Sequence, residues 1–327
     1  MHSLGFKLSV CILTAASALA QTTPGPVPLA FDVASVRPGK PGAPQHTNVP
    51  LDAGNVYATI GPDDARTAAG GLLVATHQPL WRYIVFAYKL SATQEMALRF
   101  NYFAGLPKSG APSWVTGGFD FSADPFDISA RAPADTSIDQ MRLMMQALLA
   151  ERFHLALHFQ TADAPAFALT LVHPGATGPN LRPHPASDTC GPPTPQLDQP
   201  TAAHRASAPS AVGDLPPVCG VIAHVQSSGD LHDHNAARAI PLSLLATSLP
   251  TMVGLAAIPR PVVDQTGLSG LYDFTLHWNW TPADAETGDN AAAFREALKA
   301  QLGLELKPTH APLSFLIVDR VEHPSEN

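Results

Sequence analysis

Charged side chains are scarce in this chain, and the short motifs of the commonest enzyme classes are missing. Only 14% of the 327 residues are charged, and the net charge at pH 7 is −8. Such a chain repels phosphate backbones and anionic lipids, which excludes a nucleic-acid partner held by a basic surface. The sequence contains no Gly-x-Ser-x-Gly, His-Glu-x-x-His, Cys-x-x-Cys or glycine-rich phosphate loop. We therefore predict no catalytic residue and no cofactor, while leaving open whether the protein is an enzyme.

Beyond the first twenty residues, no run is long and apolar enough to cross a bilayer. Those twenty residues are typical of a secretory signal. His2 and Lys7 precede an apolar stretch that ends at Ala18-Leu19-Ala20, a small-residue cleavage site. We therefore predict that residues 1–20 are a signal peptide cleaved near Ala20. The mature chain is expected in the periplasm or outside the cell, with no membrane span.

Cysteine is also rare, because the sequence has only three and Cys11 lies in the predicted signal peptide. Cys190 and Cys219 remain in the mature chain. In an oxidising compartment an even pair favours a disulfide. Closing this loop of about thirty residues would stabilise the fold by roughly 3–4 kcal/mol in the chain-entropy model. Two reduced thiols are the alternative.

Proline is abundant, with 33 residues, about twice the usual frequency. Prolines gather with Ser, Ala and Thr after residue 175, where apolar periodicity ends. This composition divides the chain into a first α+β module with an N-terminal strand at 21–175, a Pro-rich and disulfide-pinned connector at 176–237, and a second α+β module at 238–327.

Helices and strands follow from local patterns. Ser137 and Gln140 form a capping-box signature at the start of a helix, and Gly303 marks the end of another, near 290–302. A further helix is predicted at about 241–253. Within the last strands of the two halves, Ala164-Pro165 and Ala311-Pro312 are expected to split each into two shorter strands.

The two halves resemble each other. Phe126-Asp127-Ile128-Ser129 matches Tyr272-Asp273-Phe274-Thr275, and each half has the order helix, strand, helix, strand, strand. We therefore predict an α+β fold of two tandem modules, with mixed or antiparallel sheets, joined by the Pro-rich loop. Two unrelated α+β segments that share a common pattern of elements are the alternative.

One polar cluster offers metal ligands. Asp230, His232 and His234 supply a carboxylate and two imidazoles within five residues, and in an extended strand the two imidazoles share a face. This arrangement makes them candidates for a zinc or copper site whose other ligands come from elsewhere. A solvated loop before a helix is the alternative.

Other conspicuous side chains favour structural roles. Asp264 begins a near match to the Asp-Thr-Gly turn of aspartic proteases, but Gln265 interrupts it, so we predict an Asx-turn. His154 and His158 lie too far apart along a strand to share one metal. Arg152 is expected in an ion pair or helix cap. Four aromatic residues are expected in or beside the core rather than in a binding wall, namely Trp81, Tyr83, Tyr88 and Trp114.

Four segments carry a family resemblance: "FDVASVRP", "MMQALLAERFHLALH", "VVDQTGLSGLYDFTL" and "QLGLELKPTHAPLSFLIVDRVEHPSEN". They resemble a large uncharacterised secreted family, a domain of unknown function expanded in soil Acidobacteria of the Solibacter type. Similar domains occur attached to sensor peptidases of the beta-lactam-receptor type. The resemblance implies an extracytoplasmic binding or sensing role and assigns no catalytic residue.

From these observations we expect a non-enzymatic binding or interaction module of the cell envelope or secreted fraction. Its partner would be an unknown protein, peptide or glycan. Two alternatives stay open: a hydrolase with a metal-assisted or non-local site, and an extracytoplasmic ligand sensor.

Overall fold

A computed structural model of the chain describes most of its residues. The described ranges are 29–49, 51–53, 57–58, 71–188, 215–216, 219–226, 232–253, 257–279 and 290–324. The predicted signal peptide, Cys190 and Asp230 lie outside them, so the cleavage site and the disulfide with Cys219 stay predictions. None of the helices in these ranges has the length and apolar character needed to cross a bilayer.

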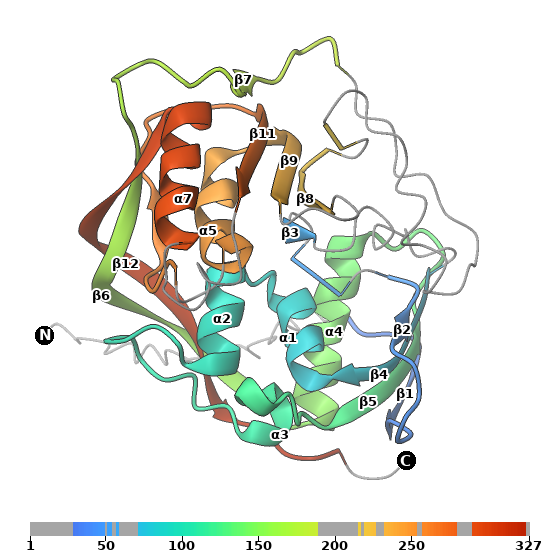
Figure 1. Ribbon diagram of the computed structural model, residues 1–327. Coiled ribbons are helices and arrows are strands. Elements are labelled where there is room, and N and C mark those ends of the chain that lie inside the picture. The colour runs from blue at the N-terminus through green and yellow to red at the C-terminus, as the bar shows by residue number, and fades with distance from the viewer. Residues whose placement is uncertain are drawn as a thin grey trace, which may run out of the picture.

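Three sheets organise the molecule, and the predicted α+β class is confirmed (Figure 1). Sheet A has the order β1-β5-β4-β2, formed by Val33–Pro38, Pro125–Arg131, Leu72–Pro79 and His46–Thr47. Sheet B has the order β3-β8-β9-β11-β7, formed by Tyr57–Ala58, Val221–Gln226, His232–Ile240, Tyr272–Asn279 and Leu181–Pro183. Sheet C has the order β10-β6-β12, formed by Val262–Asp264, Ala156–Leu171 and Leu304–Arg320.

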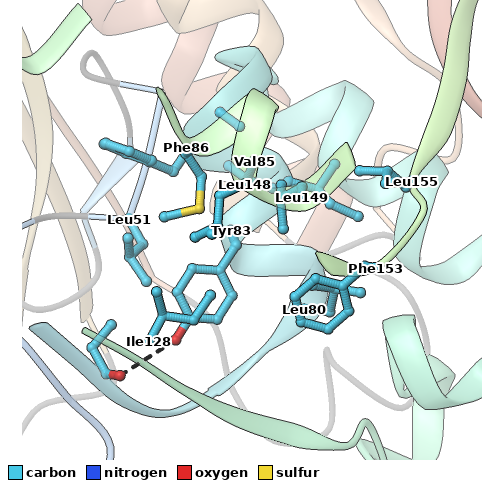
Figure 2. Close-up of a cluster of buried hydrophobic side chains, with 14 of the residues drawn as sticks. Leu51, Leu80, Tyr83, Val85, Phe86, Ile128, Leu148, Leu149, Phe153 and Leu155 are labelled. Atoms are coloured by element: carbon cyan, nitrogen blue, oxygen red, sulfur yellow. Dashed lines mark hydrogen bonds between the residues drawn. The ribbon is translucent and has the colours of Figure 1, made fainter. Parts of the chain in front are cut away.

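Helices α1 (Leu80–Tyr88) and α4 (Ile138–Arg152) pack together with sheet A around the first core (Figure 2). The predicted capping box at the start of α4 is confirmed, because the Ser137 hydroxyl accepts the Gln140 N–H and the Gln140 side chain accepts the Ser137 N–H. Tyr83 lies fully inside this core, and its hydroxyl donates to the Phe126 carbonyl at 3.0 Å.

The second core lies between sheet B and the helices α5 (Leu242–Val253), α7 (Asn290–Ala297) and the short π-helix η5 (Leu298–Leu302). Strand β11 buries alternate residues in this core, namely Phe274, Leu276 and Trp278. Gly303 ends η5 with φ 69°, the left-handed conformation predicted for a helix C-terminus.

Strands β6 and β12 are each continuous, so the predicted splits at Ala164-Pro165 and Ala311-Pro312 are wrong. The two strands pair antiparallel along almost their whole length, with Ala164 opposite Ala311. The Phe167 N–H points away from β12 and bonds the residue before β10. Residues two apart share an edge, so Pro165 also points away from the ladder and its missing N–H removes no hydrogen bond between β6 and β12.

The same two strands join the cores to each other. Leu316 and Val318, near the end of β12, lie in the first core, and Val321 packs against it. Phe167 and Leu169, near the end of β6, lie in the second core. Figure 1 shows both strands running along one side of the molecule. Each half therefore completes the apolar core of the other.

A bulge recurs just before the first helix of each half. His77 in β4 and Ala239 in β9 both have φ 54°, and each donates its N–H at 2.7 Å to a strand carboxylate, Asp127 or Asp273. In both halves the residue two positions later is a proline, and a helix begins directly after it. A non-glycine residue with this backbone is uncommon. The carboxylate supplies the hydrogen bond that the bulge removes from the ladder.

Some elements differ from those expected. Helix α2 (Ala92–Phe100) has no counterpart among the predicted elements, and the Ser91 side chain caps it in a box with Gln94. Strands β7, β8 and much of β9 fall within residues 176–237, the predicted connector, so part of this segment belongs to sheet B. Residues 189–214 within it lie outside the described ranges.

Candidate binding site

A hollow of about 210 Å³ lies beside the first core, between the end of β4, the start of α1, the end of α2 and the loop after helix α3 (Ser113–Thr116). The bulge in β4 brings His77 to its wall, and the first turn of α1 brings Trp81. Its lining includes His77, Trp81, Arg99, Thr116, Phe121 and Pro125.

Arg99, in the last turn of α2, is held in one orientation. Its guanidinium carbon lies 3.9 Å from the centre of the Trp81 ring and 4.6 Å from that of Phe100. Its Nη1 donates to Glu95 Oε1 at 2.9 Å, one helical turn earlier. The side chain is 14% exposed, so the stacking and the ion pair form where water is partly excluded. This geometry preorganises a cation at the wall of the hollow.

Two polar atoms of lining residues lack partners. Within the described part of the chain, no hydrogen bond reaches the buried Nδ1 of His77 or the buried Nε of Arg99. A buried donor or acceptor without a partner costs about 1–3 kcal/mol. Such atoms are uncommon in folded proteins and call for an explanation. Both atoms are enclosed by the surrounding protein, so they mark a local cost of packing at this wall rather than groups that a ligand reaches.

Two exposed phenylalanines belong to the loop after α3, and one of them, Phe121, lines the hollow. Phe119 is 65% exposed and Phe121 is 72% exposed, although both are large apolar side chains. They gather around Phe100, with ring centres 4.9 and 6.4 Å away. Phe121 also has φ 55°, a strained conformation for a bulky residue. Neither residue was predicted as part of a site; the sequence signal that marks them is Phe-Asp-Phe directly after Gly117-Gly118.

The C-terminal residues fasten this loop at both ends. The His323 ring stacks on Trp114 at 3.9 Å, and its Nε2 lies 2.9 Å from Asp124 Oδ2. The backbone N–H of Glu322 donates to the Phe153 carbonyl at 2.7 Å, and the Arg320 guanidinium beside Glu322 lowers the pKa of that carboxyl. Because the loop is held at residues 114 and 124, the exposed phenylalanines between them keep a defined position.

The aromatic residues considered as a binding wall divide between two environments. Tyr83 is buried in the first core, where desolvation raises its pKa above the ordinary tyrosine value, and it has no access to the hollow surface. Trp114 lies under the C-terminal residues. Of these residues, Trp81 alone lines the hollow. Trp81, Tyr88 and Trp114 pack against the first core, so the expected positions in or beside the core are confirmed for all four residues, and Trp81 lines the hollow as well.

A second cluster of ionisable groups lies on sheet B. One ligand atom each from His184, Asp188 and Asp273 lies within 4.8 Å of the others, a set that a divalent cation could use. Arg238 already pairs with both oxygens of Asp188 and lowers the pKa of that carboxyl. The His184 Nδ1 lies 2.8 Å from Asp273, which also accepts the Ala239 N–H. These contacts form a network of hydrogen bonds and one Arg–Asp ion pair that fastens residues 184–188 to the sheet.

The predicted metal ligands are only partly placed. His234 lies on β9 and stacks on His277 of β11, with ring centres 3.9 Å apart and planes 25° apart. His232 pairs with Asn279 along the backbone, and its side chain lies outside the described atoms, as does Asp230. Nearly parallel rings direct their in-plane lone pairs along separate planes, so this stack does not converge on one ion. The site stays a prediction.

The remaining candidates have structural partners. Asp264 accepts the Thr266 N–H at 3.0 Å, which confirms the predicted Asx-turn. His158 Nδ1 lies 2.9 Å from Asp319, and His154 lies 3.9 Å from Glu322, on the partly exposed surface. Arg152 pairs with Glu151 at 3.2 Å, as expected for an ion-pair residue.

Comparison with known proteins places the chain in a family. Residues 82–321 match the family model described as Protein of unknown function (DUF3738). No curated protein and no solved structure gives a significant match. The matched region includes Arg99, Phe119 and Phe121, and most of both cores. The chain belongs to the DUF3738 family.

Proposed function

We propose that this protein is an exported, non-enzymatic binding module that docks a partner protein of the cell envelope. Its docking surface, here called the aromatic surface, consists of Trp81, Arg99, Phe100, Phe119 and Phe121. The observation that carries the proposal is the exposure of Phe119 and Phe121, at 65% and 72%, beside an arginine stacked on tryptophan. Export is proposed from the N-terminal segment, residues 1–20.

The composition of this surface supports a protein partner. Aromatic residues and arginine are enriched at the centres of protein interfaces, where a few of them supply most of the binding energy. Burying one phenylalanine side chain contributes roughly 1.5–3 kcal/mol. Two guanidinium groups, of Arg82 and Arg99, lie near the Trp81 ring, and the carboxylate of Glu95 is paired with Arg99. Arg82 donates to the Gln78 side chain, an uncharged partner. An acidic group on the partner would balance the remaining charge.

We also propose that the fold is a tandem duplication. Sheet A has the order β1-β5-β4-β2, and four strands of sheet B have the corresponding order β7-β11-β9-β8. Pro38 pairs with Phe126 as Pro183 pairs with Tyr272, and both prolines follow an arginine. The bulges at His77 and Ala239 recur at matching places. These local agreements support common descent of the halves better than a shared element order alone.

If the halves are duplicates, the loop at residues 113–125 differs from its counterpart in the second half. In the second half, the turn between Asp264 and Tyr272 takes the place of residues 113–125 and carries one exposed apolar residue, Leu271. In the first half the same place carries α3 and the two exposed phenylalanines. A loop that departs from the repeat on a shared framework is where a binding function is expected.

The test compares partner binding by the full mature chain and two variants. A partner is first isolated by co-purification from the native envelope, identified, and produced in pure form. Calorimetry then measures its affinity for wild type, for the double variant Phe119→Ser/Phe121→Ser, and for Phe159→Ser. Phe159 lies on β6 and is 47% exposed, so it controls for loss of any surface phenylalanine.

We expect the double variant to bind at least a hundredfold more weakly, because two buried phenylalanines contribute roughly 3 kcal/mol or more. The Phe159→Ser variant should bind like wild type. Equal affinity of all three proteins would contradict the proposal. So would turnover of a substrate that depends on one polar residue of the hollow.

A further inference from the structure

The geometry points to a chemical group that the hollow recognises. We infer that it binds the C-terminal residue of a partner chain, with the terminal carboxylate on Arg99 and an apolar terminal side chain against Trp81. This inference rests on the proposed function and names the part of the partner that enters the hollow. Phe119 and Phe121 then contact the residues that precede this chain end.

The hydrogen-bonding capacity of Arg99 is largely unused. A guanidinium has five N–H donors and no acceptor. Only Nη1 of Arg99 is bonded, to Glu95, and the buried Nε has no partner within the described residues. The complementary ligand must therefore offer acceptors. A carboxylate offers two oxygens in the spacing that a guanidinium matches, and charge assistance makes these hydrogen bonds about twice as strong as neutral ones.

The apolar contact must come from the same ligand residue. The Arg99 guanidinium carbon lies 3.9 Å from the centre of the Trp81 ring, so a group on the arginine also lies near the indole. A C-terminal residue carries its carboxylate and its side chain on one carbon atom. The acidic side chain of an internal Asp or Glu carries only one or two methylene groups beside its carboxylate, too few to cover an indole ring. A chain end with an apolar side chain therefore fits this spacing best.

The size of the hollow agrees with one residue. Its volume of about 210 Å³ is below the 300–1,000 Å³ typical of pockets for drug-sized molecules. His77 lines the same space. One terminal residue is therefore the size of ligand that this volume accommodates.

The experiment measures three labelled peptides by fluorescence anisotropy on the full mature chain. The first is Gly-Ser-Gly-Phe with a free C-terminal carboxylate, and the second is the same peptide as its C-terminal amide. The third, Gly-Ser-Asp-Phe amide, presents an internal carboxylate next to an apolar residue. We expect the free acid to bind at least tenfold more tightly than either amide.

Three single-residue variants test whether the preference for the free acid over the amide arises at the hollow. Arg99→Met keeps an unbranched side chain against Trp81 and should reduce the acid-to-amide ratio to about one. Arg295→Met is the matched control, because Arg295 lies 5.6 Å from the Phe167 ring in the other half of the molecule. It should leave the ratio unchanged. Trp81→Leu, which retains Arg99, should weaken the acid ending in Phe more than an acid ending in Gly.

Equal binding of acid and amide by the wild type, or no binding of either, would overturn the inference. The same holds if Arg295→Met removes the preference as completely as Arg99→Met does, while both variants unfold at the wild-type temperature. If Arg99→Met is too unstable to measure, the Trp81→Leu comparison decides. Loss of partner binding in the Phe119→Ser/Phe121→Ser variant would still support the proposed function, so the two failures are distinguishable.

Discussion

Replacing Leu316 by alanine tests whether the two cores form one folding unit. Leu316 belongs to the last strand of the second half but is 2% exposed in the first core. Truncating a buried leucine to alanine costs about 2–5 kcal/mol, because apolar contacts are lost and a cavity remains. A loss of about 3 kcal/mol lowers the melting temperature by roughly 6–12 °C, on the scaling for domains of 150–250 residues.

The assay follows each core separately. One variant set retains only Trp114, which packs beside the first core, and another retains only Trp278, which is buried in the second. If β6 and β12 couple the cores, Leu316→Ala lowers the unfolding midpoint reported by both tryptophans equally. Leu143→Ala is the control, because this leucine on α4 is 49% exposed and should cost less than about 0.5 kcal/mol. A shift seen by Trp114 alone would refute the coupling.

Three further predictions concern local interactions. Ser91→Ala should destabilise the protein by about 1 kcal/mol in urea unfolding, because it removes the cap of α2, whereas Ser91→Asp should retain it. Gly178→Ala should cost at least about 2 kcal/mol in the same urea unfolding, since its Cβ would lie 2.4 Å from the Gln301 carbonyl oxygen; an unchanged stability would show that the backbone there shifts freely. Arg238 lowers the pKa of Asp188, so this pair stabilises the fold above the ordinary Asp pKa of about 4 and loses that effect as the pH falls below it. The difference in unfolding free energy between wild type and Arg238→Gln should therefore be larger at pH 7 than at pH 3, and a constant difference would argue against the ion pair.

Local signals in the sequence predicted the elements that local physics determines. The Ser137–Gln140 box, the turn at Asp264 and the helix end at Gly303 each depend on residues a few positions apart, and the structure has all three. Pro165 and Pro312 misled the strand prediction, because a proline breaks a strand only where its N–H would face the neighbouring strand. That orientation depends on a partner strand about 150 residues away in the sequence.

The candidate site depends on contacts that no local pattern contains. Arg99 lies 18 residues after Trp81 in the sequence. They meet because α2 folds back beside α1. As phenylalanines, Phe119 and Phe121 would ordinarily be expected in a core. Their exposed position depends on the loop being fastened by His323, some 200 residues later in the sequence. Histidines close in sequence, such as His232 and His234, drew attention more readily than these distant partners.

Hydrogen exchange of the mature protein, with and without the free-acid peptide at saturation, tests the central claim most directly. If the aromatic surface is the binding site, amides within residues 77–82, 99–103 and 117–125 gain protection, and those of β9 and β11 do not change. Protection confined to β9 and β11, around His234 and His277, would contradict the account and place the site on sheet B.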